Sequence, residues 1–146
     1  MKRKSSAVLL TAILLGLAGC ATMPATYTVS NSRTYNQEYD AVWEKIVQFF
    51  ASRNIPIKNI AKDSGVIYAE NTSFDASYAD CGTGGLMVPF AHRASINVFV
   101  TRTGEKPTVS VNTQFEEMRR FDANTQTVKC NSKGVIEQAV LDAIGS

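Results

Sequence analysis

The sequence predicts an α+β fold, an antiparallel sheet of four to five strands with two helices packed on one face. The expected order is strand, helix, hairpin, loop, hairpin, helix. Three observations predict it. Apolar residues recur at helical spacing after residue 36 and again near the C-terminus, stretches of alternating apolar and polar residues follow one another in pairs, and short turn sequences join the members of each pair. Strands joined in this way run antiparallel.

The first strand and the first helix are expected within residues 27–53. Residues 27–35 are rich in Thr, Val and Tyr, which favours a strand. In the helix that follows, Asn36 is placed to cap the start. Asn54 tolerates left-handed backbone and Pro56 prevents continuation, so the helix is expected to end near Arg53. Its apolar stripe consists of Tyr39, Val42, Trp43, Ile46 and Phe50, widened by Val47 and Phe49.

Two hairpins are expected after this helix. Residues 55–61 and 66–70 form the first, with Asp63-Ser64-Gly65 as its turn. Residues 91–103 and 108–115 alternate and form the second, and residues 116–129 extend its last strand and then form a loop. Ser132 or Asn131 caps the last helix, whose stripe consists of Val135, Ile136, Ala139, Val140 and Ala143.

The segment ahead of Cys20 has the form of an export signal. Three basic residues (2–4) precede an apolar stretch at 7–17 that is too short to span a bilayer as a permanent helix. The stretch ends in Leu17-Ala18-Gly19-Cys20, which resembles the lipobox of bacterial lipoproteins. The resemblance implies that the Cys20 thiol is acylated, for example with palmitate, and that the bond before it is cut. Ala21 and Thr22 follow without an Asp, which implies the outer membrane by resemblance to the enterobacterial sorting pattern.

Removal of the signal divides the chain into three parts. The resemblance implies residues 1–19 as the signal peptide, 20–26 as a lipidated cysteine with a short tether, and 27–146 as a single periplasmic domain. Without residues 2–4, twelve basic side chains face thirteen acidic ones, a net charge near −1. A nearly neutral domain lacks the basic surface that nucleic-acid binding requires, so nucleic acid is not expected as a partner.

Cys81 and Cys130 remain as a pair once Cys20 is assigned to lipid. In an oxidising compartment this parity favours a disulfide. The spacing of one histidine and two isolated thiols does not match a zinc site, so no metal and no cofactor are expected. The bridge would pin the long loop at 71–89, which has no clean period and is therefore expected to be functional or tied down.

Three features of the loop region and the strand after it are candidates for function. Phe74, Tyr78, Met87 and Phe90 form a possible interaction loop, although aromatic residues can equally fold back over the open end of the sheet. Residues 82–85 are glycine-rich but lack the Lys and Ser/Thr of a phosphate loop, which favours a plain turn.

His92 is the only histidine and could act as a general base, but a strand-end surface position is the preferred interpretation. Glu116 and Glu117 are adjacent on a strand and point to opposite faces, so they are not expected to work together. The neighbouring Arg119 and Arg120 are expected to be solvated.

The first half of the mature chain carries a second resemblance. Ala41-Val42-Trp43, Asn54-Ile55-Pro56-Ile57 and Asp63-Ser64-Gly65-Val66-Ile67 resemble the helix-grip domains of the lipoprotein subunit of the outer-membrane barrel assembly machine. The resemblance implies a small periplasmic lipoprotein domain of helix and hairpin. This chain has one such unit rather than two, and its cysteine pair is not part of the resemblance.

The expected function is therefore that of a non-enzymatic accessory or scaffold lipoprotein. It is anchored by lipid to the outer membrane of a Gram-negative cell, faces the periplasm and contacts an envelope protein. One alternative is a small-ligand binder, which predicts an apolar pocket between sheet and helices, lined by the loop at 74–90. The other is a hydrolase using His92, which predicts a carboxylate or hydroxyl within hydrogen-bond reach of the ring.

Overall fold

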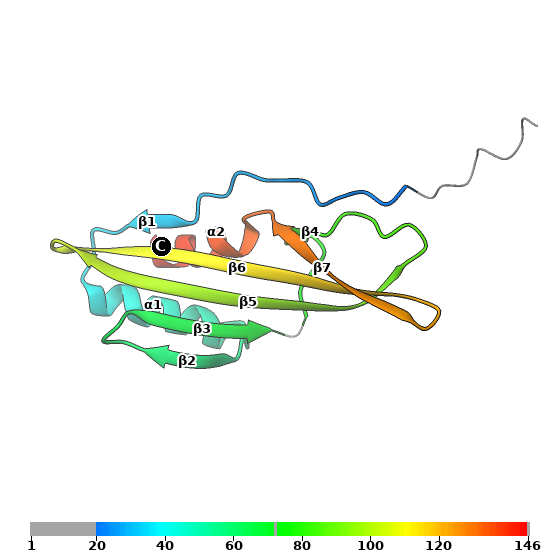
Figure 1. The fold of residues 1–146 in the computed structure, drawn as a ribbon. Helices are drawn as coiled ribbons and strands as arrows, with labels where there is room; N and C mark the ends of the chain where they lie inside the picture. Colours follow the sequence, from blue (N-terminus) through cyan, green and yellow to red (C-terminus); the bar gives the residue numbers. More distant parts are fainter. Residues whose placement is uncertain (1–19, 72, 146) are drawn as a thin grey trace, which may run out of the picture.

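The computed structural model describes residues 20–71 and 73–145, and the expected export segment 1–19 lies outside them. The fold is α+β, with two helices packed against a seven-stranded antiparallel open sheet (Figure 1). The strand order is β2-β3-β5-β6-β7-β4, and β1 pairs with β6 beside this path. The elements are β1 (Ser32–Thr34), α1 (Tyr39–Ser52), β2 (Ile57–Ala61), β3 (Val66–Asn71), β4 (Ala79–Asp80), β5 (Val88–Thr103), β6 (Lys106–Phe121), β7 (Asn124–Ser132) and α2 (Val135–Gly145).

Strands β5 and β6 form the spine of the sheet. Each has 16 residues, and they pair along almost their whole length, with Val98 opposite Val111. The second edge of β6 is shared, because β1 pairs with it at residues 108–110 and β7 at residues 115–121. In Figure 1 the β5–β6 ribbon extends well beyond both helices toward the right-hand end of the molecule.

Helix α1 begins and ends close to the predicted positions. Asn54 has a φ of 53°, and the Ile55 N–H donates to the carbonyl oxygen of Phe50 at 3.0 Å, so the chain leaves the helix just before Pro56. The expected cap is wrong: the residue ahead of the first turn is Glu38 rather than Asn36, and the Glu38 side chain makes no capping hydrogen bond.

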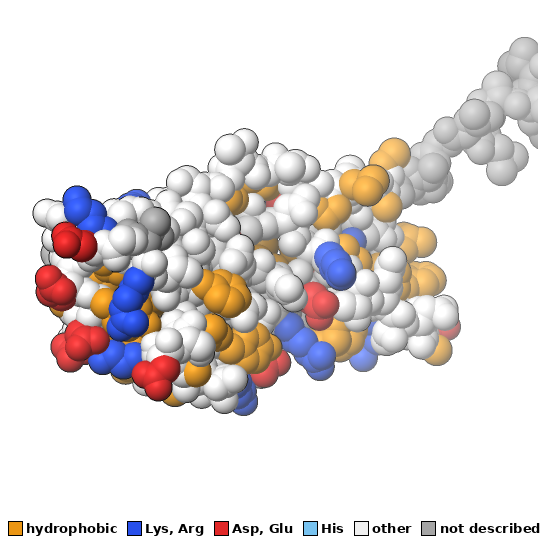
Figure 2. Space-filling model, turned by 60° about the vertical axis from the view of Figure 1, so that its left-hand side comes forward, with side chains coloured by type: hydrophobic (Ala, Val, Ile, Leu, Met, Phe, Trp, Pro, Cys, Tyr) orange, Lys and Arg blue, Asp and Glu red, His pale blue; other side chains and the backbone are white. Residues whose placement is uncertain are grey.

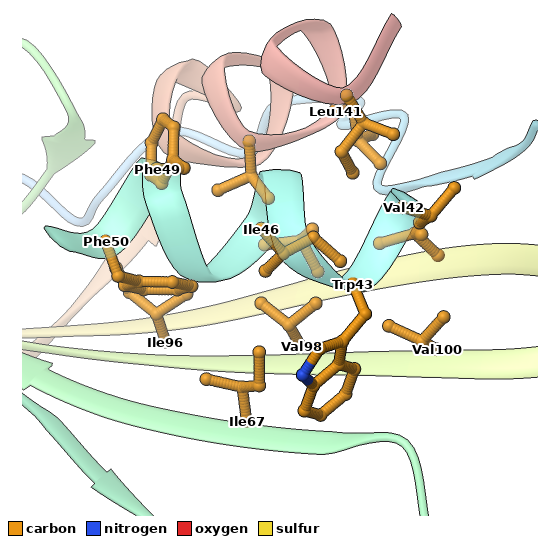
Figure 3. Close-up of a cluster of buried hydrophobic side chains, with 14 of the residues drawn as sticks. Val42, Trp43, Ile46, Phe49, Phe50, Ile67, Ile96, Val98, Val100 and Leu141 are labelled. Carbon is orange, nitrogen blue, oxygen red and sulfur yellow. The ribbon is translucent and has the colours of Figure 1, made fainter. Parts of the chain in front are cut away.

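Both helices and one face of the sheet share a single buried core (Figure 3). Trp43, Ile46 and Phe50 of α1 lie over the central strands, and Leu141 of α2 closes the other side of α1. Because β-strand side chains alternate, every second residue at 96–100 of β5 and at 109–111 of β6 joins this core, while those between point to the other face. The strand residues in the core are Ile67, Ala69, Ile96, Val98, Val100, Val109 and Val111.

Gly65 is required at the β2–β3 turn. Its φ is +66°, and its carbonyl oxygen accepts a 2.7 Å hydrogen bond from the Val100 N–H. A Cβ at this position would lie 2.0 Å from the Val100 carbonyl oxygen, so any other side chain would separate the turn from β5. The turn predicted at Asp63-Ser64-Gly65 is therefore confirmed.

The sheet has more strands than the sequence predicts. The expected first strand at 27–35 is reduced to β1, and the expected loop within 116–129 is instead the end of β6 and most of β7. Most side chains of β7 are exposed, so it lacks the apolar alternation that marks a strand. Strand β7 is held in the sheet by its hydrogen bonds to β6 and β4, although its composition does not predict a strand.

Neither helix within the described residues is long and apolar enough to cross a membrane.

Candidate functional site

An apolar pocket of about 450 Å³ lies where the helices end and the sheet continues. Its floor is formed by the sheet, one side by the chain after α1, the other side by the first turn and a half of α2, and its roof by the loop before β4. The lining residues are Arg53, Ile55, Ser73, Phe74, Tyr78, Ala94, Ile96, Phe115, Val135, Ile136 and Ala139. The volume is in the range of small-molecule sites, and the lining is mostly apolar with few polar groups, as such sites require.

Local sequence explains why this space stays open. Helix α1 ends at Ser52, and beyond Ile96 only the first turn of α2, through Ile136, still packs on the sheet residues Ala94 and Phe115. The floor residue Ala94 and the wall residue Ala139 have small side chains that do not fill the gap. The exposed Arg53 lies over the Phe49 ring at 4.1 Å, which places a positive charge at the opening.

Two of the four residues of the proposed interaction loop fold back onto the sheet. Phe74 and Tyr78 pack on a second small cluster around Ala79, Ala94 and Phe115. Of the other two, Met87 is half-buried and Phe90 is 49% exposed. The structure therefore divides the set: Phe74 and Tyr78 roof the pocket, whereas Phe90 faces outward on the early part of β5.

A polar cluster lies next to the pocket on the same face of the sheet. His92 Nε2 is 3.0 Å from Glu117 Oε2, and the Arg119 Nε–H donates to Glu117 Oε1 at 2.5 Å. Arg119 also donates to the carbonyl oxygens of Cys81 and Gly82 at 2.5 and 3.0 Å. Glu117 and Arg119 are only 7% and 4% exposed, so the expectation that Arg119 is solvated is wrong, while Arg120 is exposed as expected.

The alternation of β6 places this cluster. Odd-numbered residues from Val109 to Arg119 share the inner face, and Glu116 points to the other side, opposite Arg93. The carboxylate that the hydrolase hypothesis requires thus lies beside His92. Both carboxylate oxygens of Glu117 are engaged, however, one by His92 and the other by Arg119. Arg119 also binds the backbone carbonyls of Cys81 and Gly82, so this arrangement holds the loop at 81–82 in place. The Phe74 ring, 4.9 Å from His92 and 4.8 Å from Phe115, separates the cluster from the apolar pocket.

The predicted disulfide is confirmed. Cys81 and Cys130 are joined with an S–S distance of 2.02 Å, which ties the loop ahead of β5 to β7. Cys20 is exposed and lies outside this bridge.

The expected tether at 20–26 is hydrogen-bonded to the loop ahead of β5 and to β7. Thr22 and Thr83 exchange backbone hydrogen bonds of 3.2 and 3.0 Å, and the Asn131 amide donates to the Ala25 carbonyl oxygen at 2.9 Å. Asp80 Oδ1 accepts a 2.7 Å hydrogen bond from the Gly82 N–H. This hydrogen bond is the main reason why the pKa of Asp80 lies below its ordinary value. Its other oxygen accepts from the Tyr27 hydroxyl at 3.1 Å, and this bond raises the pKa of Tyr27.

Within the described residues no group of three or more His, Cys, Asp or Glu side chains is placed to hold a metal ion. No protein-family model matches the chain, and a comparison with curated proteins finds no similar sequence.

Proposed function

We propose that this chain is a lipid-anchored accessory protein of a Gram-negative envelope that acts by binding rather than by catalysis. Its mature form begins at Cys20, is held in the outer membrane by acyl chains on that residue and faces the periplasm. The motif Leu17-Ala18-Gly19-Cys20 carries the proposal. The disulfide supports it, because such bridges persist in oxidising compartments outside the cytoplasm.

Anchoring raises the local concentration of the domain toward other envelope proteins. The outer edge of β2 suits such a contact, because β2 is the last strand on its side of the sheet and its middle residues are exposed. An extended segment of a partner could add to this edge through main-chain hydrogen bonds.

Substitution of Cys20 by serine tests the anchor. We expect the wild-type protein to incorporate a labelled fatty acid and to sediment with the outer membrane, because the thiol is the acylation site. Cys20→Ser should lose the label and leave the outer-membrane fraction. Crosslinking followed by purification from solubilised envelopes should recover an envelope protein with the wild type only.

The Cys81–Cys130 bridge is untouched by this change, so non-reducing electrophoresis of Cys20→Ser checks that the domain still folds. A labelled Cys20→Ser protein, or an unlabelled wild type, would contradict the proposal.

The apolar pocket favours a second candidate function, the binding of a small apolar ligand with an anionic group. Arg53 at the opening suits a carboxylate, and the lining suits a hydrocarbon chain. With dodecanoate as the probe, titration calorimetry is expected to detect binding to the wild type and none to Ala139→Phe, whose ring fills the pocket. Ala51→Phe places the same ring on an exposed position of α1 and should bind as the wild type does. Equal binding of dodecanoate by both variants would contradict ligand binding in this pocket.

A further inference from the structure

Exposed apolar side chains gather at the end of the molecule where the described chain begins. We call them the apolar end: Met23, Leu86, Val88, Phe90 and Phe121, which are 90%, 72%, 66%, 49% and 50% exposed. Hydrophobic side chains stand along the corresponding right-hand edge in Figure 2. Large apolar side chains exposed together on a soluble domain mark a contact surface.

Three segments far apart in the sequence build this end. The N-terminal segment reaches it through the Thr22–Thr83 bridge, the loop before β5 contributes Leu86, and the β6–β7 turn contributes Phe121, which lies opposite Asn124. Val88 begins β5 opposite Arg120 of β6, so the loop and the turn are neighbours. The disulfide and the Arg119 contacts to the Cys81 and Gly82 carbonyls fix the loop relative to the sheet.

Cys20 is fixed to the same end. The Thr83 hydroxyl donates to the Cys20 carbonyl oxygen at 3.3 Å, and only Ala21 separates Cys20 from the clamped Thr22. Two residues of extended chain span at most about 7 Å. Acyl chains on Cys20 would therefore enter the bilayer directly beside the apolar end, without the slack of a free tether.

The charges at this end suit the headgroup region of a lipid layer. Arg120 is exposed, with its guanidinium 5.4 Å from the centre of the Phe90 ring, and long basic side chains of this kind reach phosphates while their stems contact apolar groups. Asp122 in the β6–β7 turn is also exposed, and its negative charge offsets the positive charge of Arg120. Apolar contact rather than attraction to anionic lipid is therefore expected to dominate.

From this geometry we infer that the apolar end rests in the surface of the lipid layer that holds the anchor and fixes how the domain stands on it. The β6–β7 turn and the loop before β5 enter the interface, and the edge strand β2 stays in water. The inference rests on the proposed acylation of Cys20 and adds a second contact to it.

The test compares two single cysteines in the acylated protein, reconstituted in vesicles of phosphatidylethanolamine and phosphatidylglycerol. Leu86→Cys lies in the apolar end, and Ile60→Cys lies on β2 with 48% exposure as the matched control. A water-soluble maleimide should label Leu86→Cys roughly tenfold more slowly on vesicles than in a Cys20→Ser form produced without residues 1–19, because the interface excludes the reagent. Ile60→Cys should react equally in both.

Each failure has its own signature. Equal labelling rates at Leu86→Cys with and without the membrane, on protein that mass spectrometry shows to be acylated, would overturn the docking and leave the anchor intact. Protection that grows with protein density in the vesicle would show that a second copy covers the apolar end, which also overturns it. Absence of acyl chains would remove the proposed function and this inference together.

Discussion

Replacement of Phe50 by alanine is expected to lower the free energy of unfolding by about 3 to 5 kcal/mol. Phe50 is fully buried, and its ring lies above Ile96 between α1 and the sheet (Figure 3). Truncation removes the buried ring and leaves a cavity that the flanking helix and strands can fill only in part. Urea unfolding of residues 20–146 with Cys20→Ser, a form that has no thiol to acylate at this position, measures the loss as a lower midpoint.

Phe99→Ala is the matched control. Phe99 lies on β5 but points to the other face of the sheet and is 40% exposed, so its loss should cost about 1 kcal/mol or less. Comparable losses for the two variants would mean that the buried face of β5 is not the one that Figure 3 shows.

Removal of the disulfide is expected to cost about 4 kcal/mol. Cys81 and Cys130 are 49 residues apart, and closure of a loop of this length restricts the unfolded chain strongly. The comparison is between the protein with Cys20→Ser alone and the protein that also carries Cys81→Ser and Cys130→Ser. Because whole domains are stable by only about 5 to 15 kcal/mol, such a loss would leave a marginal fold.

Reduction provides the internal control for this prediction. Dithiothreitol should lower the urea midpoint of the bridged protein to that of the double serine variant and leave the variant itself unchanged. A bridged protein whose midpoint does not respond to full reduction would contradict a stabilising role for Cys81–Cys130.

The helix and the first hairpin could be predicted because local signals agree there. The α1 stripe from Tyr39 to Phe50, the stop at Asn54 and Pro56 and the turn at Gly65 each have a direct physical cause in the residue types. The disulfide could also be predicted, since two cysteines remained to pair in an export-type sequence.

The polar cluster could not be predicted from residue types. Glu117 and Arg119 are typical of solvated strands, and only the continued alternation from Val109 and Val111 indicates that they share the buried face. Their burial depends on carbonyl groups at Cys81 and Gly82, more than 30 residues away in sequence. The pocket likewise depends on how the end of α1 and the start of α2 come together over the sheet, which no local pattern records.

The first stretch of the described chain also determines how the domain would respond to a mechanical load. From Thr22 to β1 it runs along the outside of the fold, bonded in turn to Thr83, Asn131 and the edge of β6 at Ser110 (Figure 1). A force applied at Cys20 would load these hydrogen bonds one after another, starting at Thr83, and would break them in that order. The hydrophobic core would bear the force only after this N-terminal segment had detached. A force on Cys20 therefore need not unfold the domain.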